Sequence, residues 1–93
     1  MYKLASFFKV YYDDRTEECG VVHKKEYATV KTAENCAHKR FKSKKYRKDF
    51  HQSKIALGAK AMSEFCIVVD ENEENVNSDY WMHREGPEGF VYC

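Results

Sequence analysis

The sequence predicts one small α+β domain, in which a small antiparallel sheet (β-β-α-β-β-β order) has one principal helix packed on one face. Three observations support this prediction. The 93 residues suffice for one core but are too few for two. Apolar residues alternate along residues 4–12, as in a strand. Along residues 33–41 they recur instead at the spacing of one helix face. We therefore expect residues 1–93 to form a single domain.

The first predicted strand, Leu4–Tyr12, carries aromatic side chains on both faces. Phe7 and Tyr11 share one face, and Phe8 lies on the other. This pattern predicts either burial on both sides or one face held open for a ligand. A polar turn at residues 13–18 precedes a second predicted strand at residues 19–30, so the two strands should form an antiparallel hairpin.

The principal helix is predicted to begin at Thr32, a good N-cap residue with an acid two residues later. Its buried face is formed by residues at i, i+3, i+4 and i+8, namely Ala33, Cys36, Ala37 and Phe41. After Phe41, basic residues take the positions on this same helix face. Burying unpaired cations is costly, so we expect the helix to overhang the core from about Lys42, with Tyr46 and Phe50 beside the cations.

The second half of the sequence predicts mainly strands. Residues 50–61 fit either a short strand or a helical turn, and Gly58 would interrupt both. Met62–Val69 is a nearly continuous apolar run that predicts a buried strand. Residues 78–84 and 89–92 flank a segment with Gly86 and Pro87, which predicts a hairpin near the end of the sequence.

Charges are strongly segregated along the chain. Residues 39–63 hold nine basic side chains and one acid, whereas residues 64–93 hold eight acids and one basic side chain. The net charge of +1 conceals these two clusters. A local basic cluster attracts polyanions whatever the total charge, although such a run can also be a solvated face or be neutralised by an acidic segment.

Aromatic residues interrupt the basic segment, and this combination is typical of proteins that bind single-stranded RNA. Cations bind phosphates, while rings stack on unpaired bases. The predicted RNA-binding residues are Lys39, Arg40, Lys42, Lys44, Lys45, Tyr46, Arg47, Lys48, Phe50 and Lys54. Phe7 and Tyr11 could extend this surface, although Phe7 and Phe41 also suit a core. We therefore expect a small, non-enzymatic RNA-binding protein, with RNA as the main partner.

Two other functions fit the sequence. The acidic side chains Asp70, Glu71, Glu73 and Glu74 could mimic phosphates in a protein-binding inhibitor or adaptor of host or defence machinery. A small metal-independent ribonuclease could use two histidines and a lysine. In its short, Lys-, Glu-, Tyr- and Phe-rich composition the chain resembles accessory proteins of phages. The RNA-binding protein could accordingly be a phage- or mobile-element-encoded inhibitor, antitoxin-like, that acts on an RNA or ribonucleoprotein such as a toxin.

No cofactor or metal is expected. Cys19, His23, Cys36 and His38 have ligand chemistry, but their spacing matches no pattern that brings zinc ligands together. The first residues do not resemble a secretion signal, and no apolar run is long enough for a membrane span, so we expect a cytoplasmic protein with free thiols. The two clusters of opposite charge also permit a homodimer.

Overall fold

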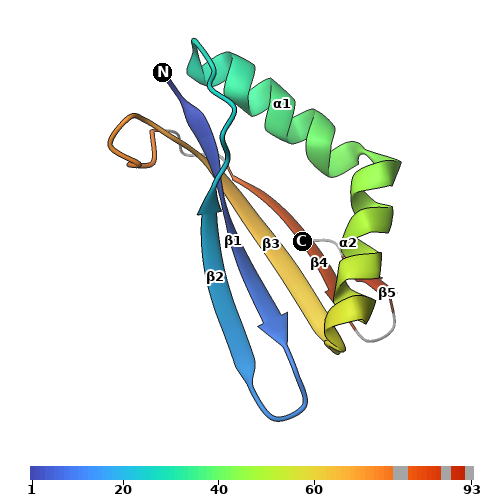
Figure 1. Cartoon of the computed structure of the whole chain (residues 1–93). Coiled ribbons are helices and arrows are strands. Elements are labelled where there is room, and N and C mark those ends of the chain that lie inside the picture. Colours follow the sequence, from blue (N-terminus) through green and yellow to red (C-terminus); the bar gives the residue numbers. More distant parts are fainter. Residues whose placement is uncertain (77–79, 87–88, 92–93) are drawn as a thin grey trace.

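The computed structural model describes residues 1–76, 80–86 and 89–91. Its elements follow the order β1 (Lys3–Tyr11), β2 (Thr16–Val22), α1 (Val30–Lys42), α2 (Lys44–Leu57), β3 (Ala61–Val69), β4 (Trp81–Gly86) and β5 (Gly89–Val91). All five strands join one antiparallel sheet in the order β2-β1-β3-β4-β5. Both helices lie over the same face of the sheet (Figure 1). The predicted α+β class with an antiparallel sheet is confirmed. Parts of the predicted final hairpin, including Ser78, Pro87 and Tyr92, lie outside the described residues.

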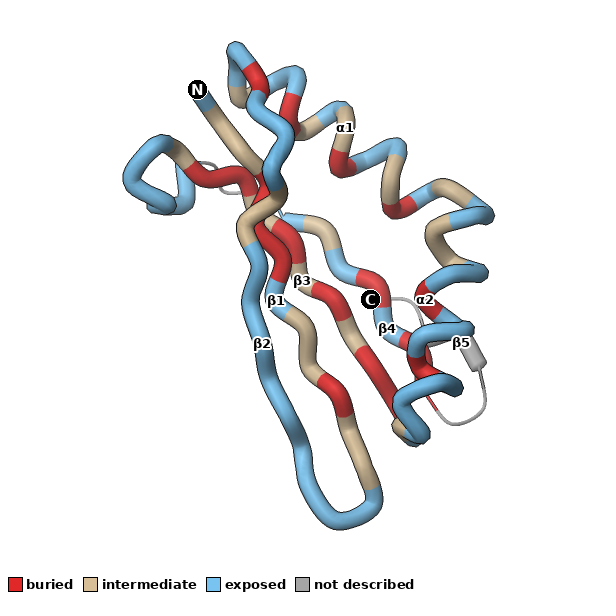
Figure 2. The backbone as a smooth tube through the Cα atoms, viewed as in Figure 1, coloured by how far each residue is buried: buried red, intermediate tan, exposed pale blue. Residues whose placement is uncertain are grey.

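The β1–β2 hairpin forms as predicted, but β2 occupies different residues. It ends at Val22, not at residue 30. Beyond it Tyr27 makes an isolated bridge with Tyr2, in which each backbone N–H donates to the other residue's carbonyl. β2 is an edge strand and is exposed along nearly its whole length (Figure 2). On β1, Leu4, Ser6 and Val10 are buried on the face that the helices cover.

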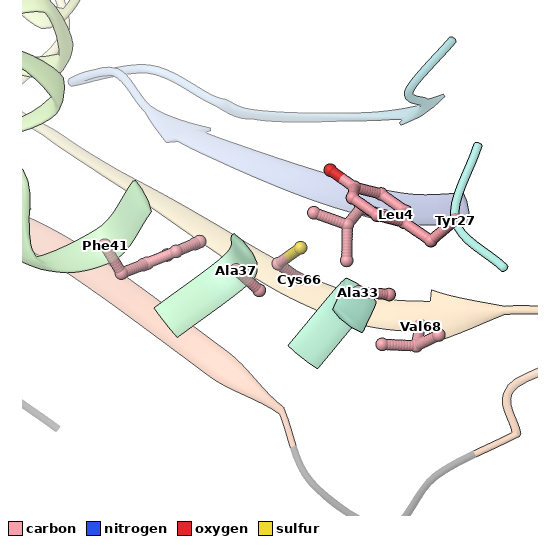
Figure 3. Close-up of a cluster of buried hydrophobic side chains, with 7 residues drawn as sticks. All are labelled: Leu4, Tyr27, Ala33, Ala37, Phe41, Cys66 and Val68. Carbon is pink, nitrogen blue, oxygen red and sulfur yellow. The ribbon is translucent and has the colours of Figure 1, made fainter. Parts of the chain in front are cut away.

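Helix α1 begins earlier than predicted, because Thr29 and not Thr32 is its N-cap. The Thr29 hydroxyl oxygen accepts a hydrogen bond from the Thr32 backbone N–H at 3.2 Å. The predicted buried face is confirmed for Ala33, Ala37 and Phe41, whereas Cys36 is only partly buried. Its residues pack against β1, β3 and Tyr27 in the cluster drawn in Figure 3, which contains Leu4, Tyr27, Ala33, Ala37, Phe41, Cys66 and Val68. Two alanines one turn apart let the helix lie close to the sheet.

A second helix follows where the sequence predicted an overhang. α2 starts at Lys44 and continues to Leu57, where Gly58 ends it in the left-handed conformation, at φ 69°. This resolves residues 50–61, which the sequence left between strand and helix. Phe50 of α2 is buried against Val10 and Met62, so α2 packs on the sheet and does not project into solvent.

The interior also contains polar and charged side chains. Ser6, Lys54, Glu64, His83 and Glu85 are all buried. Buried charges require ion pairs or hydrogen bonds, because removal from water otherwise costs several kcal/mol. The partners of the two buried carboxylates determine how both helices sit on the sheet.

Candidate nucleic-acid interface

The two helices meet at Ser43, and we call this turn the elbow. The Ser43 backbone is extended, at φ −67° and ψ 131°. Its N–H donates to the carbonyl of Arg40, and its side-chain oxygen accepts from the N–H of Tyr46 at 3.3 Å. One serine therefore ends α1 and caps α2. A small polar residue whose side chain caps the next helix favours a break over one continuous helix. This explains why the prediction of a single overhanging helix was wrong.

Five of the ten predicted RNA-binding residues are exposed around the elbow. We call them the elbow lysines: Lys39, Lys42, Lys44, Lys45 and Lys48. None of them forms an ion pair with another residue in the described parts of the chain. Lys44 and Lys45 lie in the first turn of α2, which contains no acidic residue. Because a helix N-terminus is itself partly positive, this position favours a bound anion.

The other five predicted residues are at least partly buried. Phe50 is only 5 % exposed and Lys54 only 7 %. Arg40, Tyr46 and Arg47 are half-buried. The prediction that Phe50 offers its ring to solvent is therefore wrong, and the Tyr46 hydroxyl points to a buried carboxylate. These side chains hold the helices on the sheet, whereas the elbow lysines face solvent.

The carboxylate that binds Arg40 and Tyr46 belongs to Glu64, in the middle of β3 and 1 % exposed. Both terminal nitrogens of Arg40 donate to it, Nη2 to Oε1 at 3.2 Å and Nη1 to Oε2. The Tyr46 hydroxyl donates to Oε1 at 3.0 Å. The Ser6 hydroxyl donates to Oε2 at 2.6 Å. Glu64 thus joins α1, α2 and β1 to β3.

Two further groups complete this network. Because the Ser6 hydroxyl donates to Glu64, it accepts from Nε2 of His23 at 2.7 Å. The Arg40 guanidinium lies over the Tyr46 ring, 4.8 Å from its centroid. Burial, together with the charge of Glu64, raises the pKa of the Tyr46 phenol, so this group stays protonated and keeps donating.

A second buried carboxylate, Glu85 of β4, anchors the far half of α2. It is 0 % exposed. Lys54 Nζ lies 3.4 Å from Glu85 Oε1 and donates to the Gly86 carbonyl at 3.0 Å. Nδ1 of His51 also contacts Glu85. Lys54 is therefore part of the interior, in contrast to its predicted role in binding RNA.

An open cavity of about 640 Å³ lies between α2 and the β1–β2 hairpin. Its walls are mainly apolar, and Arg40 and Lys45 are among the residues around it. The apolar residues that line it include Phe8, Val10, Phe50, Leu57 and Met62. One side of the elbow therefore borders a hollow.

The acidic residues lie at the other end of the molecule from α2 (Figure 1). Asp70, Glu71, Glu73 and Glu74 form a turn after β3. The Asp70 carboxylate accepts from the N–H groups of Asn72 and Glu74, at 2.8 and 3.1 Å. Glu71 pairs with the terminal amino group. The acidic turn does not neutralise the elbow lysines within the described chain.

Comparison with protein family models, with curated proteins and with solved structures finds no match. The fold and surface define a small α+β domain with a basic elbow. Neither α1 nor α2, the helices of the described residues, is long and apolar enough to span a membrane. The described residues contain no cluster of three or more side chains suited to hold a metal ion, and Cys19, Cys36 and Cys66 are free thiols.

Sequence reasoning missed the partners Ser6, His23, Glu64 and Glu85. One signal could have revealed Glu64, because it alternates with Met62, Cys66 and Val68 on the apolar face of a predicted strand. A carboxylate at such a position requires cationic partners. Glu85 gives no such signal, because the strand that holds it is not strongly apolar.

We expect Glu64→Gln to lower the free energy of unfolding by about 3 kcal/mol, because Arg40 would lose its charged partner in a partly buried site. Urea denaturation measures this change. Glu18→Gln is the matched control, since Glu18 is exposed and pairs with Lys9 at 3.5 Å, and its removal should cost about 0.5 kcal/mol or less. Equal losses in the two variants would contradict the anchoring role of Glu64.

Stability should fall as the pH drops through and below 6.5, the ordinary pKa of histidine. Burial and nearby Arg47 lower the pKa of His83 below its ordinary value of 6.5, and burial and Arg40 lower that of His23. The unfolded chain therefore takes up protons first, so the stability present above pH 6.5 is lost below it.

His83→Phe should reduce this loss without abolishing it, because His23 still contributes. The new ring can keep the contact with Phe50, whose centroid lies 4.6 Å from that of His83. Urea denaturation at several pH values measures the effect, with the exposed His38→Phe as control. The pKa assignment fails if both variants keep the full pH dependence.

Proposed function

We propose that this protein binds RNA without catalysing a reaction, and that the elbow lysines hold the phosphate backbone. The observation that carries the proposal is the position of these five lysines. They are exposed, they make no ion pair with a described residue, and two of them lie at the positive N-terminus of α2. The positive charges of the five lysines repel one another, and a bound anion reduces this repulsion. The phosphate backbone of RNA supplies several anions at once.

The geometry favours a contact with little sequence preference. Lysine ammonium groups act as mobile point charges, and contacts to phosphates carry no base information. The guanidinium of Arg40, which could form a bidentate contact, is already bound to Glu64. Binding of this kind would suit an inhibitor that captures the RNA of a ribonucleoprotein such as a toxin, as expected from the sequence.

The test is the salt dependence of binding to a fluorescent single-stranded RNA, followed by anisotropy. If all five elbow lysines contact phosphates, the slope of log K against log salt should be about −3.5. The double variant Lys44→Gln with Lys45→Gln should bind more weakly and make the slope less steep by about 1.4, because two phosphate contacts are lost.

The matched control is Lys24→Gln with Lys25→Gln, which removes the same charge from two exposed lysines before α1. Its slope should remain close to that of the unmodified protein. If the control flattens the slope equally, bulk charge and not the elbow attracts the RNA. If the unmodified protein does not bind RNA at low salt, the proposed function is wrong.

A further inference from the structure

The face of the sheet opposite the helices carries a row of large side chains. The register places Gly20, Phe7, Phe65 and Met82 directly opposite one another on four neighbouring strands. Phe7 is on the other face of β1 from Leu4 and Val10, which the helices cover. Its side chain is 49 % exposed and that of Tyr80, just before β4, is 59 % exposed. Exposed apolar side chains that adjoin one another, unlike single scattered ones, often mark an interaction site.

The rings on this face form a continuous strip, which we call the aromatic row: Phe7, Phe65 and Tyr80. The Phe7 and Phe65 centroids are 6.4 Å apart, and those of Phe65 and Tyr80 are 4.9 Å apart. The planes are tilted by 44° and 33°. Successive rings at these separations offer adjacent platforms for flat groups.

Glycine at position 20 keeps one end of the row open. A β-carbon there would lie 3.3 Å from Cδ1 of Phe7. Beside Phe7 is a shallow hollow of about 500 Å³, lined among others by Lys9, Gly20 and Phe65. A planar group can therefore reach the side of the Phe7 ring over Gly20, where no side chain intervenes, while Glu18 and Cys19 of β2 line the hollow further along.

Cations accompany the rings on this face. The guanidinium of Arg84 lies 5.7 Å from the centroid of Tyr11, and Lys9 Nζ lies 5.5 Å from the same ring. Lys9 also pairs with Glu18 at 3.5 Å, whereas Arg84 makes no ion pair within the described residues. The rings on this face can stack on bases, and the nearby Arg84 guanidinium can bind a phosphate. This combination matches the chemistry of a single nucleic-acid strand.

We infer that the aromatic row binds unpaired bases of a single-stranded RNA by stacking, with Arg84 contacting its backbone. This inference rests on the proposed function and extends it, since it defines the ligand as a strand with exposed bases. The faces of bases in a duplex are covered by their neighbours, so a duplex should not use the row. Stacking accepts every base, so the row adds affinity with little sequence preference.

The experiment compares two probes of equal charge, an oligoadenylate of about 16 nucleotides and an abasic strand with the same number of phosphates. The unmodified protein should bind the oligoadenylate more tightly. Phe7→Ala and Tyr80→Ala should each weaken that binding by about 5- to 100-fold, with the affinity for the abasic strand and the salt slope unchanged. Ile55→Ala is the matched control, because Ile55 is 62 % exposed on α2 and should leave both affinities unchanged.

The variant Phe7→Leu distinguishes a loss of stacking from a loss of folding, because leucine keeps an apolar contact with Phe65 but has no flat ring. It should weaken binding of the oligoadenylate as Phe7→Ala does. Equal binding of the two probes by the unmodified protein would overturn the inference and leave the elbow lysines as the RNA site. Absence of binding to both would instead refute the proposed function. A third outcome would also overturn the inference. In it, the free protein forms dimers, Phe7→Ala dissociates them, and the unmodified protein binds both probes equally. The aromatic row would then be a contact with a second copy of the chain.

Discussion

The carboxylate of Glu64 is the constraint on which the arrangement of the helices depends. It lies in the sheet and cannot be hydrated, so it needs donors from the elements above it. Arg40 comes from α1, Tyr46 from α2 and Ser6 from β1. Because Arg40 and Tyr46 lie on either side of Ser43, their common partner fixes the angle of the elbow. The elbow lysines project into solvent because their neighbours are held by Glu64.

The basic segment is therefore divided into two sets of side chains with different tasks. Arg40 and Lys54 neutralise buried carboxylates of β3 and β4, and Phe50 fills the core below α2. The elbow lysines have no such partner in the described chain and are exposed to solvent, which is why we propose them as the phosphate contacts. A charge count over residues 39–63 adds both sets together, and therefore overstates the number of basic side chains that are exposed to solvent. The rings within the segment are buried or half-buried, whereas the exposed rings of Phe7 and Tyr80 lie on the open face of the sheet.

Local patterns in the sequence predicted most of the fold. The alternation in β1, the apolar run of β3 and the helical spacing of Ala33, Ala37 and Phe41 reflect which side each residue turns to the core. The second helix was not predictable in this way. Its packing depends on Glu64, 18 residues from Tyr46, and on Glu85, 31 residues from Lys54. Likewise, the sequence left Phe7 between a surface ring and a core side chain. Only the strand register brings Phe65 beside it, and Tyr80 in turn lies beside Phe65. The exposure of the five lysines was predicted correctly because cations without partners remain in water.

The most direct test of the account is an NMR titration of the isotope-labelled protein with a single-stranded RNA. If the elbow and the aromatic row both bind RNA, backbone amide signals should change around residues 39–48 at the elbow and around Phe7 and Phe65 on the open sheet face. Signals of the acidic turn at residues 70–74 should stay in place. Changes confined to the acidic turn, or no change at any RNA concentration, would contradict the account.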